Sequence, residues 1–204
     1  IRNINDLPPV FTKSIYSAEI TEGMPAGTLV TRECVAVSSD KGDDEANEID
    51  YSLSGASNDV DNFEIRADGS VYTTVELDRD IMTSSTGSIF IRVVAVDRGS
   101  PKKAAQAFLR VTVIDLKDTD PVITSTRSTC SVPEGRLGSI TPPLIGVDPD
   151  QNDPLTWTFV GDHEGFSIDG GVITLTEEMD ADQLQEVVRL NIKVTDTTGA
   201  ADAK

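Results

Sequence analysis

The sequence is poor in the residues that most catalytic and soft-metal sites require, with one histidine, two cysteines, one tryptophan and 5% aromatic residues in 204. A zinc site needs several Cys or His ligands at short spacing, and neither Cys34 nor Cys130 has such a neighbour. Both cysteines lie among alternating β-type residues, so we expect free, half-buried thiols. His163 lies in the polar run 162–165 and is expected in an exposed turn.

Cations and long apolar runs are also scarce. The 17 Lys and Arg against 35 Asp and Glu give a net charge of −18. Nucleic acids and anionic membranes are bound mainly through Lys and Arg, so this charge excludes both as partners. The sequence has no run of 18 apolar residues and no phosphate-binding glycine loop, and nothing at Ile1 resembles a signal sequence, so we expect neither a membrane span nor an export signal within the sequence shown.

The sequence instead contains an internal repeat, which the length of two domains of about 100 residues allows. Five segments of the first half return in the same order in the second half. The pairs are Glu22-Gly23 with Glu134-Gly135, Tyr51-Ser52-Leu53 with Trp157-Thr158-Phe159, Phe63-Glu64-Ile65 with Phe166-Ser167-Ile168, Leu77-Asp78-Arg79-Asp80 with Met179-Asp180-Ala181-Asp182, and Val96-Asp97 with Thr195-Asp196. We therefore expect two tandem copies of one module.

Apolar residues alternate with polar ones in both copies, as in 89–96, 108–114 and 190–194. This period of two predicts strands, and short strands separated by Asp-Gly, Gly-Gly and Ser-Pro turns are typical of an antiparallel β-sandwich. No segment has a sustained helical stripe, and 182–187 is expected to be a turn. The predicted fold is all-β, with a first repeat at 1–114, a linker at 115–121 and a second repeat at 122–204.

Many carboxylates lie at strand ends and turns, at positions that the two copies share. Clustered carboxylates repel one another unless they share a cation, and oxygen ligands without thiolate or imidazole favour Ca²⁺ over zinc or copper. Mg²⁺ is disfavoured because it keeps its waters. A solvated acidic surface is the alternative interpretation of composition alone.

The motifs resemble those of the cadherin superfamily over essentially the whole chain. Glu22-Gly23 and Glu134-Gly135 are similar to its XEX motif, and Leu77-Asp78-Arg79-Asp80 is similar to LDRE with Asp for the final Glu. Residues 115–121 resemble the DXNDNXP linker, residues 148–150 the DXD motif, and Thr195-Asp196 the final AXD element.

This resemblance implies two Greek-key β-sandwiches joined end to end by a linker that binds three Ca²⁺ ions, which would make a flexible joint rigid. It also implies a calcium-dependent adhesive or mechanical tether in the extracellular part of a single-pass membrane protein, with another cadherin as homophilic or heterophilic partner. The implied metal ligands are Glu22, Asp78, Asp80, Asp115, the Leu116 carbonyl, Asp118, Thr119 through its carbonyl, Asp148, Asp150 and Asp196.

Two places depart from the family pattern. Lys117 stands where the linker motif has its first Asn and would bring an ammonium among Asp148, Asp150 and Asp196, which should exclude the third ion or weaken its binding. At the start of the chain, residues 3–9 resemble the remnant of a preceding linker, with Asn3 for its leading Asp and Leu7 for its second Asn. The matching DXD position reads Ser38-Ser39-Asp40, so this end, which includes Asn5 and Asp97, is expected to hold little or no calcium.

Two other functions compete with this one. Carboxylates two residues apart, such as Asp78 and Asp80, could serve a glycosidase, but such pairs in a turn rarely face each other across a cleft. A metal-independent immunoglobulin-like or fibronectin-like spacer is the second alternative.

Two further expectations concern the second copy. Trp157, the only tryptophan, matches Tyr51 and is expected in a core rather than as an exchanged N-terminal anchor. The second copy is also expected to lack its last strand, since only eight residues follow Asp196.

Overall fold

The computed structural model describes residues 4–38, 40, 47–82, 86–125, 129–140, 142–150, 153–180, 182 and 188–196. It divides into two compact units, Ile1–Leu116 (unit 1) and Lys117–Lys204 (unit 2), and this boundary falls inside the predicted linker. In the described part of the chain, no helix has the length and apolar character that a membrane span needs.

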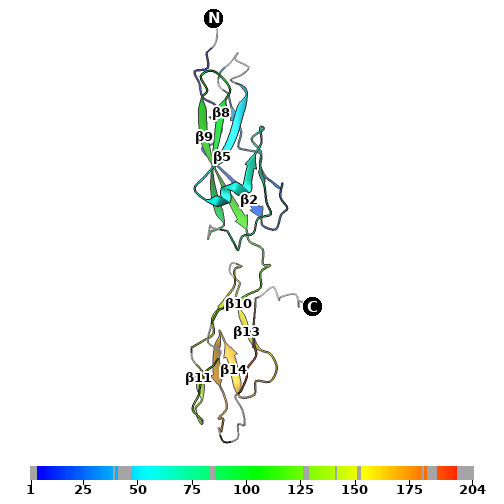
Figure 1. The fold of residues 1–204 in the computed structure, drawn as a ribbon, viewed down its shortest axis with the longest axis vertical. Helices are drawn as coiled ribbons and strands as arrows, with labels where there is room; N and C mark the ends of the chain where they lie inside the picture. The colour runs from blue at the N-terminus through cyan, green and yellow to red at the C-terminus, as the bar shows by residue number, and fades with distance from the viewer. Residues whose placement is uncertain are drawn as a thin grey trace. The chain divides into compact units, whose positions relative to one another are not determined.

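Unit 1 is built from strands, which form a four-stranded sheet in the order β2-β9-β8-β5, a three-stranded sheet in the order β3-β7-β6, and the pair β1-β4 (Figure 1). The elements are β1 (Val10–Phe11), β2 (Ile15–Thr21), β3 (Leu29–Thr31), β4 (Ala36–Val37), β5 (Ile49–Ser54), the 3₁₀ helix η1 (Asn58–Asn62), β6 (Phe63–Ile65), β7 (Val71–Thr73), β8 (Ser88–Asp97) and β9 (Ala104–Ile114).

The predicted alternation is present in the long strands of unit 1. Buried and exposed residues alternate in β8 and β9, and Ile91 and Leu109 lie opposite each other with no exposed surface. Tyr16 of β2 and Phe63 of β6 belong to the same apolar cluster, so the two sheets share one core. The all-β class predicted from the sequence is confirmed.

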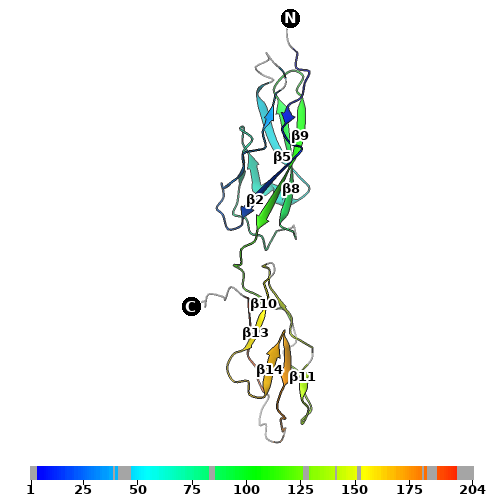
Figure 2. The ribbon, with the colours of Figure 1, turned by 180° about the vertical axis from the view of Figure 1, so that it is seen from behind.

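One pairing differs from an all-antiparallel sandwich, because β2 runs parallel to β9 from Ile15 opposite Phe108 to Thr21 opposite Ile114. Both strands are visible from the reverse side in Figure 2. Alternation reports which face of a strand is buried and not which way its neighbour runs, so the sequence could not reveal this direction.

Unit 2 repeats part of this plan with shorter strands. Its elements are β10 (Val122–Ile123), β11 (Gly138–Ile140), β12 (Gly146–Val147), β13 (Thr156–Phe159), β14 (Phe166–Asp169), β15 (Val172–Leu175) and β16 (Ile192–Thr195). They pair as β10-β12, β11-β15-β14 and β13-β16. The β14-β15 hairpin matches β6-β7, and the β13-β16 pair matches β5-β8, as the sequence repeat predicts.

The remaining single-residue expectations have mixed outcomes. His163 is exposed and stacks on Phe159, with ring centroids 4.9 Å apart. Both cysteines are free, but neither is half-buried: Cys130 is exposed, whereas Cys34 is fully buried and its burial raises the pKa of the thiol to about 11. Trp157 is partly buried. Of the expected turn at 182–187 only Asp182 is described, and the residues after Asp196 lie outside the described part of the chain.

Candidate metal centre

The carboxylate of Glu22 organises the end of unit 1 that precedes the linker. It is 3% exposed, and it accepts hydrogen bonds from the backbone N–H of Arg79 and from that of Leu116, the latter at 2.6 Å. The backbone N–H of Gly23 also donates to the carbonyl of Leu77 at 2.9 Å. The buried Glu22 side chain thus connects its own XEX-like turn to the LDRE-like turn and to the start of the linker.

Asp78 and Asp80 lie in the turn that Glu22 holds. The backbone N–H of Asp80 donates to Asp78 Oδ1 at 3.0 Å, so the Asp78 side chain closes the turn on its own backbone. Asp78 is exposed, while Asp80 and Asp115 are partly buried. This end of unit 1 therefore presents carboxylate oxygens from three separate segments of the chain.

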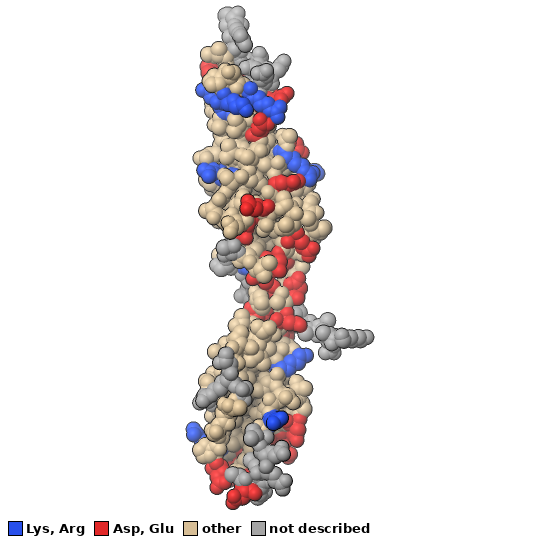
Figure 3. All heavy atoms as spheres, in the orientation of Figure 1, with Lys and Arg blue, Asp and Glu red and all other residues tan. Residues whose placement is uncertain are grey.

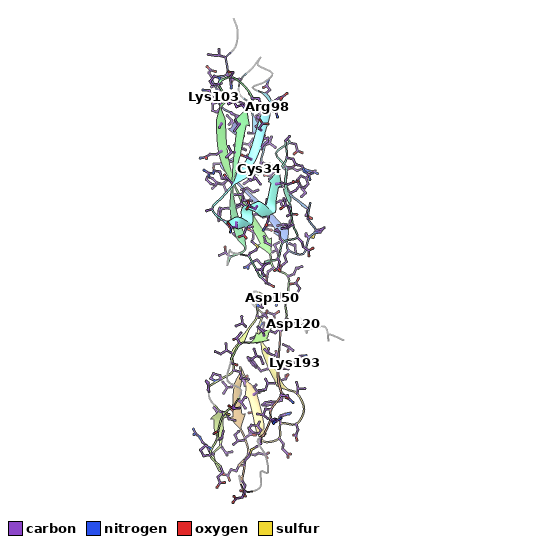
Figure 4. The ribbon with its side chains drawn as sticks, viewed as in Figure 1. Cys34, Arg98, Lys103, Asp120, Asp150 and Lys193 are labelled. Atoms are coloured by element: carbon purple, nitrogen blue, oxygen red, sulfur yellow. The ribbon has the colours of Figure 1, made fainter. Side chains whose placement is uncertain are left out.

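The beginning of unit 2 holds the rest of the linker through a second set of carboxylates. The backbone N–H of Thr119 donates to Asp150 Oδ2 at 3.3 Å, and the backbone N–H of Asp150 donates to Asp148 Oδ1 at 3.0 Å. Carboxylate oxygens of Asp118 and Asp150 lie within 4.8 Å of each other. Asp150 is 4% exposed, and Figure 4 shows it at the end of unit 2 that carries β10.

A further cluster of three carboxylates lies in the same region of unit 2. Oxygens of Asp148, Asp153 and Asp196 lie within 4.8 Å of one another. Asp196, directly after β16, is 7% exposed, and its Oδ1 and Asp148 Oδ2 are buried without a hydrogen-bond partner. Such oxygens are costly unless a cation or a proton neutralises them.

Lys117 enters this cluster, but through a partner that the motifs did not indicate. Its Nζ lies 2.8 Å from Asp153 Oδ2, and the Asp153 side chain has no exposed surface. The sequence placed Lys117 among Asp148, Asp150 and Asp196; the structure gives Asp153 as its ion-pair partner. No family motif covers Asp153, and the signal that could have found it is its place four residues before Trp157, where the first copy has Asn47 before Tyr51.

The opposite end of unit 1 gathers the equivalent residues of the first copy. Asn5, Asp40 and Asp97 are 2%, 4% and 1% exposed, and Asn5 Nδ2 donates to Asp97 Oδ1 at 2.9 Å. The backbone N–H of Leu7 donates to Asp40 Oδ2 at 3.1 Å, which repeats the contact between Thr119 and Asp150. Asn3 and Ser39 lie outside the described residues. Among the described residues, two carboxylates and one amide gather there, and the expectation of little or no calcium at this end stays a prediction.

The donor chemistry fits a hard cation at all ten predicted ligand positions, and only Lys117, which stands between them in the linker, does not fit one. The ten predicted ligands fall into two sets, with Glu22, Asp78, Asp80, Asp115 and Leu116 in unit 1 and Asp118, Thr119, Asp148, Asp150 and Asp196 in unit 2. All of them offer carboxylate or carbonyl oxygens, which are the ligands that Ca²⁺ takes. Lys117 has three donors and no lone pair in its charged form, so it cannot coordinate a metal ion.

The second copy repeats the turns of the first at its far end. The backbone N–H of Asp182 donates to Asp180 Oδ1 at 2.9 Å, and the backbone N–H of Gly135 donates to the Met179 carbonyl at 3.4 Å. These contacts reproduce those of Asp78, Asp80 and Gly23 in the first copy. The repeat seen in the sequence is therefore also a repeat of local structure.

Known proteins match this chain over most of its length. A model of the cadherin domain matches residues 16–114. Protocadherin Fat 4 of Homo sapiens is 31% identical over 91% of this chain and 4% of its own length. The protocadherin-like wing polarity protein stan of Drosophila melanogaster is 32% identical over 97% of this chain and 6% of its own length. The chain thus spans only a small part of these relatives.

Solved structures give the same fold. Mouse cadherin-23 EC22-24 superposes with a TM-score of 0.78 at 24% identity, over 96% of this chain and 61% of that one. Mouse protocadherin-24 EC1-3 superposes with a TM-score of 0.69 at 26% identity, over 90% of this chain and 61% of that one. With the repeated motifs and the matching β-sandwich architecture, these findings establish that the chain belongs to the cadherin superfamily and is a segment of its extracellular cadherin repeats.

Proposed function

We propose that this chain is a calcium-stiffened segment of an extracellular adhesion or tether protein, in which Ca²⁺ ions bound by carboxylates of both units and the linker limit the bending of the joint. The observation that carries the proposal is the Glu22 carboxylate, which is buried at the end of unit 1 and accepts a hydrogen bond from the backbone N–H of Leu116 in the linker. A buried carboxylate held by two backbone N–H groups is fixed in place before any ion arrives, so a metal ion would meet prepositioned ligands.

Charge supports the same function. Figure 3 shows Asp and Glu side chains exposed on both units, and the chain carries a net charge of −18. Carboxylates that converge on a joint repel one another without a divalent ion, and this repulsion favours open and mobile arrangements. Bound Ca²⁺ would replace that repulsion with bridges between the segments.

The partner and the anchor are also part of the proposal. We assign the chain to the extracellular region of a membrane protein and expect another cadherin as its partner, homophilic or heterophilic. Relatives such as cadherin EGF LAG seven-pass G-type receptor 3 of Mus musculus are seven-pass receptors by name, so a seven-pass anchor fits this proposal as well as a single-pass one.

The proposal is tested by calcium titration with two variants of the linker. Extracellular calcium modules bind with Kd values of about 10⁻⁴ to 10⁻³ M, so a few millimolar calcium should add about 1–3 kcal/mol to the free energy of unfolding. Asp118→Asn should remove most of this gain. Asp120→Asn, two residues further on and exposed, is the matched control and should keep it.

Stiffening is measured separately by small-angle X-ray scattering. Calcium should narrow the distribution of distances between the two units in the native chain and in Asp120→Asn, but not in Asp118→Asn. An unchanged melting temperature and an unchanged scattering curve on addition of calcium would refute the proposal in favour of a metal-independent spacer.

A further inference from the structure

We propose that the ammonium group of Lys117, held by Asp153, is a built-in cation that takes the place of one calcium ion at the beginning of unit 2. The resemblance implies three ions at the linker, and in this chain one of those positions would be filled by a side chain. The inference rests on the proposed calcium function and adds to it a site in which a lysine side chain replaces the metal ion.

The first support is the charge of the cluster. Asp148, Asp153 and Asp196 bring three carboxylates within 4.8 Å of one another, and Asp196 Oδ1 and Asp148 Oδ2 are buried without a hydrogen-bond partner. The Lys117 ammonium lies 2.8 Å from the fully buried side chain of Asp153. A single positive charge is therefore already present at the place where a cation is needed.

The second support comes from comparing the two copies at the position of Asp153. Asn47 lies four residues before Tyr51, and Asp153 lies four residues before Trp157. The two aromatic residues occupy the same register position, opposite Ala95 in β8 and opposite Val194 in β16. The first copy thus has a neutral Asn where the second copy has a buried aspartate.

The partner position changes in the same way. Lys117 stands in its linker where Asn5 stands in the earlier one, and Asn5 Nδ2 donates to Asp97 and to the carbonyl of Pro101 at 2.9 and 2.8 Å. At these two matching positions the first copy therefore has Asn5 and Asn47, and the second copy has Lys117 and Asp153. The added positive charge and the added negative charge occur together, which is the pattern of a compensated pair.

A covalently attached cation differs from a bound ion because it cannot dissociate. The ion pair of Lys117 with Asp153 needs no bound metal, so it would hold the linker against unit 2 at any calcium concentration. Loss of calcium would then release only the attachment of the linker to the bound ions, while this fastening within unit 2 remains.

The first experiment counts calcium ions by equilibrium dialysis at saturating calcium. Lys117→Asn restores the Asn found in the first copy and removes the ammonium, so it should bind one more calcium ion per chain than the native protein. Lys193→Asn is the control. Lys193 is exposed in β16, and its substitution removes the same charge from the same unit. Equal stoichiometry in Lys117→Asn and the native chain would overturn the inference.

The second experiment is a double-mutant cycle in a calcium chelator, followed through the fluorescence of Trp157. Lys117→Asn alone leaves Asp153 buried without its cation and should lower the folding equilibrium constant of unit 2 by about tenfold or more. Lys117→Asn combined with Asp153→Asn places Asn at both positions, as in the first copy, and should recover most of that loss. Additive losses from the two substitutions would contradict the pairing.

The two proposals fail in different ways. If calcium changes neither the melting temperature nor the scattering curve of the native chain but Lys117→Asn binds an ion, the proposed function is wrong. The inference that Lys117 replaces a calcium ion then stands. If the native chain is stabilised by calcium and Lys117→Asn gains no ion, the proposed function stands, and the inference that Lys117 replaces a calcium ion is wrong.

Discussion

At the scale of single residues, Glu22 has a structural role that can be separated from metal binding. It is buried and accepts two backbone hydrogen bonds, so Glu22→Ala should lower the free energy of unfolding of unit 1 by about 3 kcal/mol even in a chelator, since two N–H groups lose their acceptor. Glu22→Gln keeps one acceptor oxygen and should lose about 1 kcal/mol. Urea unfolding followed by far-UV circular dichroism measures both changes.

Glu19→Ala is the control for these variants, because Glu19 is exposed on the same strand, β2. It should change the free energy of unfolding by less than about 0.5 kcal/mol. If Glu22→Ala were as stable as Glu19→Ala in the chelator, the carboxylate would act on stability only through metal.

The sequence was sufficient to place the motif residues at turns and strand ends but not to describe their contacts. Glu22 was predicted as a ligand, and its hydrogen bonds to Arg79 and Leu116 depend on a chain path that no local pattern encodes. Asp153 was missed because it lies outside every motif and becomes significant only through the Lys117 side chain. Spacing predicts where a ligand lies along the chain, whereas an ion pair depends on the fold.

At the scale of elements, the two glycines of the β14-β15 hairpin should differ in how well they tolerate a side chain. Gly170 and Gly171 both have positive φ, at 52° and 79°, but a Cβ at Gly171 would lie 2.4 Å from the Leu144 carbonyl oxygen, whereas a Cβ at Gly170 would meet nothing within 4 Å. Gly170→Ala should cost about 1 kcal/mol from its left-handed backbone, and Gly171→Ala about 2–4 kcal/mol because the backbone of Leu144 must also move.

Urea titration of unit 2 through Trp157 fluorescence compares the two variants, with Gly170→Ala as the matched control. Equal losses in the free energy of unfolding would mean that the segment around Leu144 moves to make room for the new methyl group. The hairpin would then not be held in place by that segment.

The hairpins themselves were predictable, because Asp-Gly and Gly-Gly between apolar runs indicate tight turns. The direction of β2 and the 3₁₀ helix η1 were not. The first is set by which strand lies beside β9, a contact between distant parts of the chain. The second depends on Ser57, whose side chain accepts a hydrogen bond from the backbone N–H of Asp59 in a segment without periodicity.

At the scale of the whole molecule, the sequence repeat predicted two modules but not their unequal cores. Of the 18 buried hydrophobic residues in the described part of the chain, 16 lie in unit 1, and only Leu175 and Val194 lie in unit 2. Because buried apolar area supplies most of the free energy of folding, the two units should differ in stability despite the sequence repeat that they share.

In a chelator, unit 2 should therefore unfold at a lower urea concentration than unit 1. Trp157 is the only tryptophan and lies in unit 2, so its fluorescence reports on that unit alone, whereas far-UV circular dichroism reports on the strands of both. The fluorescence transition should come first, and the second step of the dichroism transition should coincide with that of a fragment ending at Leu116, which contains the complete apolar cluster of unit 1. Coincident fluorescence and dichroism transitions in the full chain would show instead that the two units unfold as one cooperative body, with coupling stronger than the difference between their cores.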